Sequence, residues 1–202
     1  MPVEICVTKQ VIRLTNAGGD VLTCIPFREI GSLLAAHHCQ CGPPDRLETC
    51  GANLVSGGFN PEHAVKFATA VIRWGGGLRL ISRFKEENCP KAVGEKLAKA
   101  WTLLSGEQGQ EPATVGKAVA TVAQLQNIGQ SFASKIVRFL APDRAVIMDR
   151  VIRDTLGYRE TQDGYAAFLS DCLAVLDALK PGYPCLRVAD VDAAIFAKLQ
   201  NF

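Results

Sequence analysis

The sequence predicts a mainly α-helical fold that opens with a small β-hairpin. After residue 27, apolar residues recur three or four positions apart in most segments, which is the spacing of one buried helix face. The first 27 residues instead alternate and are rich in Val, Ile and Thr, as strands are. We therefore divide the chain into an N-terminal β-hairpin extension, residues 1–27, and a helical domain, residues 28–202.

The composition is that of an ordinary folded protein. Hydrophobic residues make up 48% of the 202 positions and charged residues 21%, so a packed core can form. No apolar run reaches the roughly 18 residues of a membrane span, and the first residues do not have the pattern of a signal peptide. We expect a cytoplasmic monomer without a membrane partner, its eight cysteines reduced.

The N-terminal hairpin is predicted from two alternating stretches. They run over residues 5–8 and 21–25, and the turn-forming stretch 16–20 lies between them. Pro26 ends the second strand, and helical spacing follows over residues 27–38. Residues 39–59 are rich in Gly, Pro and Cys, so we expect a loop there.

Local signals mark the helix boundaries that follow. Asn60 can cap a helix, Pro61 suits its first position, and the glycines 75–77 end it, which predicts a helix over 61–74. The other predicted helices cover residues 78–87, 90–104, 112–124, 131–140, 165–179 and 188–199, with a further helix starting near Asp149 and with Asp190 capping the last one.

A short turn ending in glycine joins two of these helices into a hairpin at about residues 112–141. The turn is Asn127-Ile128-Gly129, and a helix opens directly after it. The first N–H groups of a helix have no partner within it, and the helix dipole favours an anion there. A DNA phosphate would fit, so we expect Asn127, Gly129 and Gln130 to contact double-stranded DNA.

The charge is unevenly distributed. The whole chain carries only +2, which neither supports nor excludes a nucleic-acid partner. Between residues 117 and 159, however, seven Lys and Arg face three Asp, giving +4. We therefore expect Arg138, Arg150 and Arg153 to contact DNA as well.

One motif resembles a known family. Leu125-x-x-Ile128-Gly129, a helix, and Asp149 placed 20 residues after the glycine are similar to the helix-hairpin-helix signature of the DNA glycosylase superfamily that includes 8-oxoguanine glycosylases and endonuclease III. This likeness covers about residues 112–157. The Trp74 and triple-glycine break is similar to bacterial 8-oxoguanine-DNA-glycosylase-like proteins. The resemblance implies a helix-hairpin-helix glycosylase-like fold for the helical domain.

The resemblance also implies catalytic roles. Asp149 would stabilise the cationic sugar that forms as a base leaves, although an Asp before a helix can equally be its N-cap. Glycosylases that also cleave the strand have a lysine where this chain has Ser131, which implies a monofunctional enzyme that uses water. Lys135 lies one turn further on the same helix face. Its role stays open between a nucleophile, a partner that keeps Asp149 ionised and a solvated surface lysine.

A flipped-out base needs a pocket with apolar or aromatic faces. Trp74, Ser131 and Phe132 are the candidates for contacts to the base, and Phe139 is a weaker one. Aromatic residues at helical spacing are usually core residues, so this alternative stays open for Phe132 and Phe139.

Two groups of residues that include cysteines are candidates for a metal site. A zinc site would need ligands from His37, His38, Cys39, Cys41 and Cys50, whose spacing fits no common pattern. An iron–sulfur cluster would need four cysteines near the C-terminus, where only Cys172 and Cys185 lie. We expect neither a metal nor another cofactor.

The sequence thus predicts a DNA glycosylase that flips out a damaged or modified base and excises it by hydrolysis of the N-glycosidic bond. The substrate could be a lesion in base-excision repair or a deliberate modification in foreign DNA, as in phage defence. Two alternatives stay open. One is a non-catalytic helix-hairpin-helix DNA-binding module, and the other is a helical domain that binds a small molecule or a protein.

Overall fold

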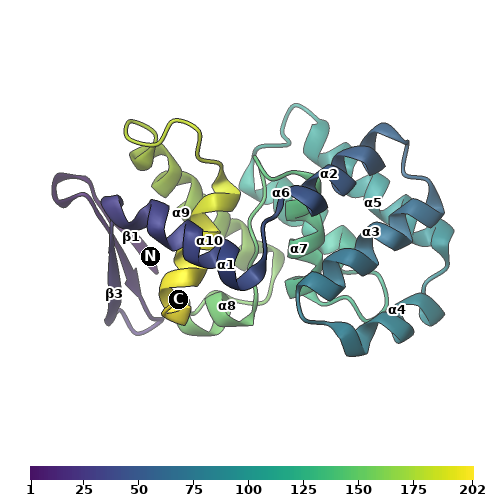
Figure 1. Ribbon diagram of the computed structural model, residues 1–202, viewed down its shortest axis with the longest axis horizontal. Coiled ribbons are helices and arrows are strands. Elements are labelled where there is room, and N and C mark those ends of the chain that lie inside the picture. The colour runs from purple at the N-terminus through teal and green to yellow at the C-terminus, as the bar shows by residue number, and fades with distance from the viewer.

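The computed structural model describes all 202 residues and is mainly helical, as predicted. A three-stranded sheet is followed by ten α-helices (Figure 1). The strands are β1 (Val3–Cys6), β2 (Val11–Thr15) and β3 (Val21–Pro26). The helices are α1 (Ile30–Cys41), α2 (Asp45–Ser56), α3 (Pro61–Trp74), α4 (Ile81–Glu87), α5 (Pro90–Ser105), α6 (Pro112–Val122), α7 (Gln130–Leu140), α8 (Arg150–Leu156), α9 (Gln162–Leu179) and α10 (Val188–Gln200).

The sheet has one strand more than the predicted hairpin. The predicted strands over residues 5–8 and 21–25 overlap β1 and β3, which are not neighbours in the sheet. β3 pairs instead with β2, and the side chain of Asn16 accepts hydrogen bonds from the backbone of the turn between them. The additional strand, β2, also pairs antiparallel with β1. It arises because a single 3-10 turn over Val7–Lys9 is followed by Gln10 in the left-handed conformation, at φ 50°, which reverses the chain.

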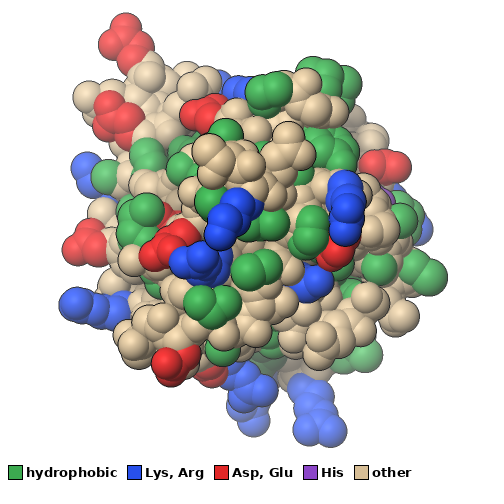
Figure 2. Space-filling model, turned by 90° about the vertical axis from the view of Figure 1, so that its left-hand side faces the viewer, with side chains coloured by type: hydrophobic (Ala, Val, Ile, Leu, Met, Phe, Trp, Pro, Cys, Tyr) green, Lys and Arg blue, Asp and Glu red, His purple; other side chains and the backbone are tan.

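The sheet lies at one end of the molecule beside α9 and α10 (Figure 1). Its inner side chains Ile12, Leu14 and Ile25 are fully buried in the same core as the helices. Figure 2 shows this end of the molecule, where apolar side chains are scattered among charged ones. Val7 and Val21 are among the large apolar residues exposed near the sheet.

The loop expected for residues 39–59 is wrong, because α2 occupies most of that stretch. Leu47, Gly51 and Leu54 are buried at helical spacing. Gly51 lies against the backbone oxygen of Phe139 in α7, and a Cβ there would be closer than van der Waals contact allows. Packing against α7 therefore stabilises a helix that contains Gly, Asn and Thr, residues of low helix propensity.

The other helices follow the prediction closely. α3 has its expected bounds, and the side chain of Asn60 accepts hydrogen bonds from the backbone N–H groups of Glu62 and His63. Asp190 is not the cap of α10 as predicted. It lies in the first turn, where its carboxylate accepts from the backbone N–H of Arg187, the actual N-cap residue.

The helices form two groups. α1, α8, α9 and α10 lie towards the sheet, and α2 to α5 form the opposite end, with α6 and α7 between (Figure 1). α6 packs against both α5 and α9 and so connects the groups. None of the helices is both long and apolar enough to cross a lipid bilayer.

α6 and α7 are the two helices predicted for the hairpin, and they pack against each other. The connection between them is anchored by Asn88, whose side chain exchanges hydrogen bonds with the backbone of Gln126. Asn127, at φ 61°, is the left-handed residue of the connection. Gly129 has an ordinary φ of −76°, and a Cβ there would meet no atom within 4 Å. Neither conformation nor packing therefore requires glycine at position 129.

Candidate active site

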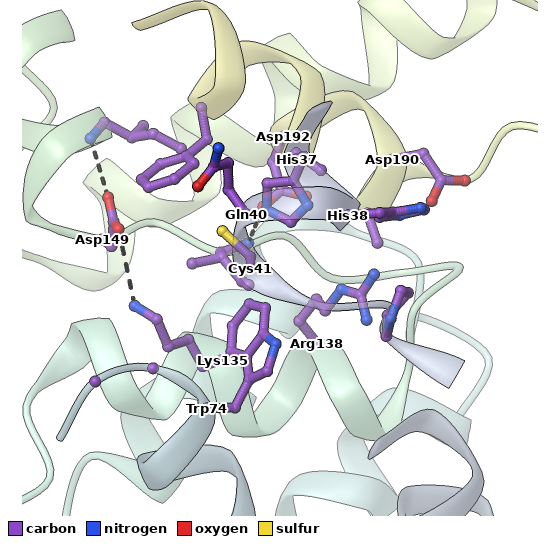
Figure 3. A pocket seen from close by; sticks show the side chains of 18 residues that line it. His37, His38, Gln40, Cys41, Trp74, Lys135, Arg138, Asp149, Asp190 and Asp192 are labelled. Atoms are coloured by element: carbon purple, nitrogen blue, oxygen red, sulfur yellow. Dashed lines mark hydrogen bonds and ion pairs between the residues drawn. The ribbon is translucent and has the colours of Figure 1, made fainter. Parts of the chain in front are cut away.

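A cavity of about 340 Å³ lies between the two groups of helices. Its walls come from α1, α10, α7 and the end of α3, together with the stretch leading into α8 (Figure 3). The lining residues are His37, His38, Gln40, Cys41, Pro44, Trp74, Gly75, Gly76, Lys135, Arg138, Ile147, Asp149, Ile152, Ala189, Asp190, Asp192, Ala193 and Phe196.

The extended stretch before α8 is held in place by side chains from three helices. The backbone N–H groups of residues 146–148 donate in turn to the hydroxyl of Tyr165, the carboxylate of Asp192 and the hydroxyl of Ser134, over 2.8 to 3.2 Å. Three consecutive anchors leave this backbone little freedom. They determine where the next residue, Asp149, projects.

Asp149 caps a helix and also lines the cavity. Its Oδ1 accepts from the backbone N–H of Ile152 at 3.1 Å, so the residue caps α8. Its Oδ2 lies 3.9 Å from the amine of Lys135, and the residue lines the cavity. One oxygen is therefore structural, and the other is available to the cavity.

Lys135 is buried, with 7% of its surface exposed, which excludes the alternative of a solvated surface lysine. Its Nζ donates to the hydroxyl of Ser131 at 3.2 Å, in addition to its ion pair with Asp149. Burial lowers the pKa of the amine, while the carboxylates of Asp149 and Asp192 oppose that shift.

The triple glycine lets α7 approach the end of α3. A Cβ at Gly75 would lie 2.9 Å from the side chain of Lys135, and one at Gly77 would lie 2.5 Å from the ring of Phe132. Side chains of α7 therefore fill the space beside Gly75 and Gly77. At Gly76, whose φ is 79°, a Cβ would meet no other atom within 4 Å. Gly75 and Gly76 both line the cavity.

The three aromatic candidates have different positions. Trp74 forms part of the cavity wall, and its ring meets that of Phe139 edge to face at 4.9 Å. Phe139 is fully buried and belongs to the core. Phe132 packs over the glycines and beside the amine of Lys135 and is not part of the lining.

Sequence reasoning missed the opposite wall, which α1 and α10 supply. His37 is 9% exposed, and burial lowers its pKa to about 4, so its ring is neutral at neutral pH. Asp192 is 2% exposed, and burial raises its pKa to about 7, against the effects of Arg138 and the Ile147 N–H. The signal in the sequence was Asp192, a charged residue within the otherwise apolar stretch 191–197.

Arg138 is not a surface residue, contrary to its prediction as a DNA contact. It is 4% exposed and donates to Oε1 of Glu48 at 2.6 Å. The other oxygen of Glu48 accepts from Arg187 at 2.7 Å, and Arg187 also pairs with Asp190. This network joins α2, α7 and the start of α10 at the edge of the cavity.

The other predicted DNA contacts lie nearer the surface. Asn127 donates to Glu87, and Gln130 donates to the backbone oxygen of Thr161. Gly129 is exposed, and no side chain caps α7, so the first N–H groups of that helix have no partner in it. Two predicted DNA contacts are arginines of α8. Arg150 is exposed and has no ion pair, whereas Arg153 forms ion pairs with Asp154 and Glu160.

The zinc alternative finds no support in the arrangement of side chains. No three His, Cys, Asp or Glu side chains lie close enough together to hold a metal ion. His37, His38 and Cys41 line the cavity, whereas Cys50 lines a separate groove between α2 and α3.

Comparisons with protein families, with curated proteins and with solved structures find no match for this chain.

Proposed function

We propose that the protein is a DNA N-glycosylase that hydrolyses the bond between deoxyribose and a base held in the cavity. One observation carries the proposal. The free oxygen of Asp149 faces the cavity 3.9 Å from the amine of Lys135, which in turn bonds to Ser131, two residues after Gly129. The carboxylate, the cavity and the start of α7 are therefore close together, as an enzyme that holds DNA at α7 and works on a flipped base requires.

The size of the cavity supports a base as its occupant. At about 340 Å³ it lies at the lower end of the range for small-molecule sites, which begins at roughly 300 Å³. An enzyme that acts on a base must take it out of the duplex and enclose it. Trp74 provides an aromatic wall for such a ring.

Asp149 has two tasks in this proposal: it first stabilises positive charge on the sugar, and it then acts as a general base toward water. As the C1′–N bond breaks, the base leaves with the electron pair and takes up a proton, and positive charge develops on the sugar. The carboxylate stabilises that charge, and it accepts a proton from the water that forms the new C1′–O bond. Lys135 forms an ion pair with this carboxylate, and the hydroxyl of Ser131 holds the amine beside it.

The start of α7 supports a contact with the DNA backbone. The N–H groups of residues 130–132 lack helix partners, and Gly129 beside them is exposed. Because the protein itself does not require glycine at that position, the close approach of a phosphate is a physical reason for it.

The test is base release from duplex DNA. Duplexes with varied base modifications are incubated with the protein, freed bases are identified by mass spectrometry, and abasic sites are counted. Asp149→Asn should reduce release by about 100-fold or more, because the charge is lost. Asn is an equally good N-cap, but it leaves the buried amine of Lys135 without its counter-charge, so melting curves must show that the variant is folded in the assay. Asp154→Asn, an exposed carboxylate on the same helix, is the matched control.

A non-catalytic DNA-binding module is the second candidate. It is favoured by Ser131, which cannot form a Schiff base, and by the pairing of Arg138 and Arg153 within the protein. This candidate predicts salt-dependent binding of DNA without base release, unchanged by Asp149→Asn. Absence of any salt-dependent affinity for DNA would contradict both candidates and favour a site for a small molecule or a protein.

Borohydride trapping addresses Lys135 separately. If water is the nucleophile, no covalent adduct forms with DNA. An adduct that is lost in Lys135→Ala and kept in Ser131→Ala would instead show that the amine attacks the sugar.

A further inference from the structure

Two buried polar atoms in the wall formed by α1 and α10 have no hydrogen-bond partner. They are Nδ1 of His37 and Oδ1 of Asp192, on side chains that are 9% and 2% exposed. Both residues line the cavity, and Figure 3 shows them on the side opposite Trp74. Leaving such atoms unpaired is unfavourable, so a cavity that keeps them is suited to a ligand that pairs them.

The two oxygens of Asp192 are not equivalent. Oδ2 accepts from the backbone N–H of Ile147, which holds the stretch that leads to Asp149. Oδ1 is therefore the atom left for a ligand, and as part of a carboxylate it accepts a hydrogen bond from an N–H donor. Arg138 does not satisfy it, since that guanidinium bonds to Glu48.

His37 supplies the complementary group. Its ring is neutral, so one of its two nitrogens carries a hydrogen and can donate it. With the hydrogen on Nδ1, the same wall of the cavity presents a donor from α1 and an acceptor from α10. An edge that offers an N–H and a carbonyl side by side would pair both atoms.

From this pairing we infer that the cavity selects a base with a lactam edge, in which a ring N–H lies next to a carbonyl, as in bases of the guanine, hypoxanthine and uracil type. The inference rests on the proposed function and names its substrate class. The ring N–H of a lactam is more acidic than an exocyclic amino group, so it forms the stronger bond with a carboxylate. The ring nitrogen at the corresponding place in adenine carries a lone pair, which the carboxylate repels.

The experiment measures binding of free bases and needs no cleavage of DNA. Hypoxanthine, 1-methylhypoxanthine and adenine are titrated into the full chain at pH 8, with calorimetry as readout. The methyl group removes the ring N–H and leaves the carbonyl. Hypoxanthine should bind about 10-fold to 100-fold more tightly than the other two, which is the effect of one hydrogen bond to a charged group.

Asp192→Asn is the decisive variant, because it changes one atom and leaves the anchor intact. Its amide oxygen can still accept from Ile147, which places the amino group where Oδ1 was. An acceptor thus becomes a donor, and the preference should reverse in favour of adenine. Melting curves show whether the fold is unchanged.

Two further variants separate the roles. His37→Phe keeps the ring against Phe196, whose centroid is 6.0 Å away, but loses the donor. It should weaken hypoxanthine and 1-methylhypoxanthine by the same factor and so keep their ratio. Asp154→Asn is the control, because that carboxylate is exposed and lies outside the cavity lining. Its preference should equal that of the unaltered protein.

The outcomes distinguish this inference from the proposed function. Equal binding of hypoxanthine and 1-methylhypoxanthine, tighter binding of adenine, or no binding of any base would overturn the lactam inference, whatever the duplex assay shows. Selective binding that reverses in Asp192→Asn would support it. If no duplex then releases a base, the glycosylase proposal fails while the selective site remains.

Discussion

Replacing Asp192 by Asn should also change how the stability of the protein depends on pH. Asp192 is 2% exposed, and burial raises its pKa from 3.8 to about 7, although Arg138 and the Ile147 N–H act in the opposite direction. Other charges near it come from Asp149, Asp190 and Lys135. Asn is neutral at every pH, has nearly the same volume and retains the bond to Ile147.

The sign follows from proton binding. Between pH 3.8 and about 7 the folded protein holds a proton on Asp192 that the unfolded chain has released. The free energy of unfolding therefore falls as the pH rises through this window. At about 1.4 kcal/mol for each pH unit, the cost is about 2 kcal/mol at pH 5 and about 4 kcal/mol at pH 8, a difference of about 2 to 3 kcal/mol.

Urea unfolding at pH 5 and pH 8 measures this difference. The stability of Asp192→Asn relative to the unaltered protein should rise by about 2 to 3 kcal/mol between the two pH values, equivalent to roughly 5 to 10 °C in melting temperature for a chain of this size. Asp154→Asn, at an exposed site, should show no such rise. The same relative stability of Asp192→Asn at both pH values would refute the reasoning, because Asp192 would then not titrate in this window.

Three further variants test an ion-pair network, a contact between two helices and a helix cap, each by urea unfolding. Glu48→Gln should cost about 3 kcal/mol, because a buried arginine loses its counter-charge, and a loss below about 1 kcal/mol would mean that the network behaves as a surface pair. Gly51→Ala should cost about 2 kcal/mol, since the added methyl meets the backbone oxygen of Phe139, and an unchanged midpoint would contradict the close approach of α2 and α7. Asn60→Ala should cost about 1 kcal/mol through the lost cap, whereas no loss would show that water replaces it.

The parts of the fold that were predicted carry their signals locally. α3 begins with a capping Asn60 and a proline and ends at glycines, so its bounds could be predicted from adjacent residues. α2 has no such signals, and the contact that stabilises it, between Gly51 and the backbone at Phe139, joins residues far apart in the sequence. β2 was missed because the chain reversal at Gln10, just before it, has no glycine, asparagine or proline to indicate it.

The candidate site divides in the same way. Asp149 could be chosen as a candidate from the sequence because it and Gly129 belong to one short stretch, 20 residues apart. The burial of Arg138 could not, since its partner Glu48 is 90 residues away. Likewise, whether His37 and Asp192 face a cavity or the core depends on how α1 packs on α10, which periodicity within either helix does not determine.

The wall made by α1 and α10 has a consequence for how the site is assembled during synthesis. Asp149 and Lys135 emerge from the ribosome before residues 188–200, which complete the cavity. Until then the ion pair faces water, without the carboxylate of Asp192 that anchors the stretch before α8. A nascent chain that has folded up to α9 therefore holds the ion pair but no enclosure around it, and enclosure comes with α10.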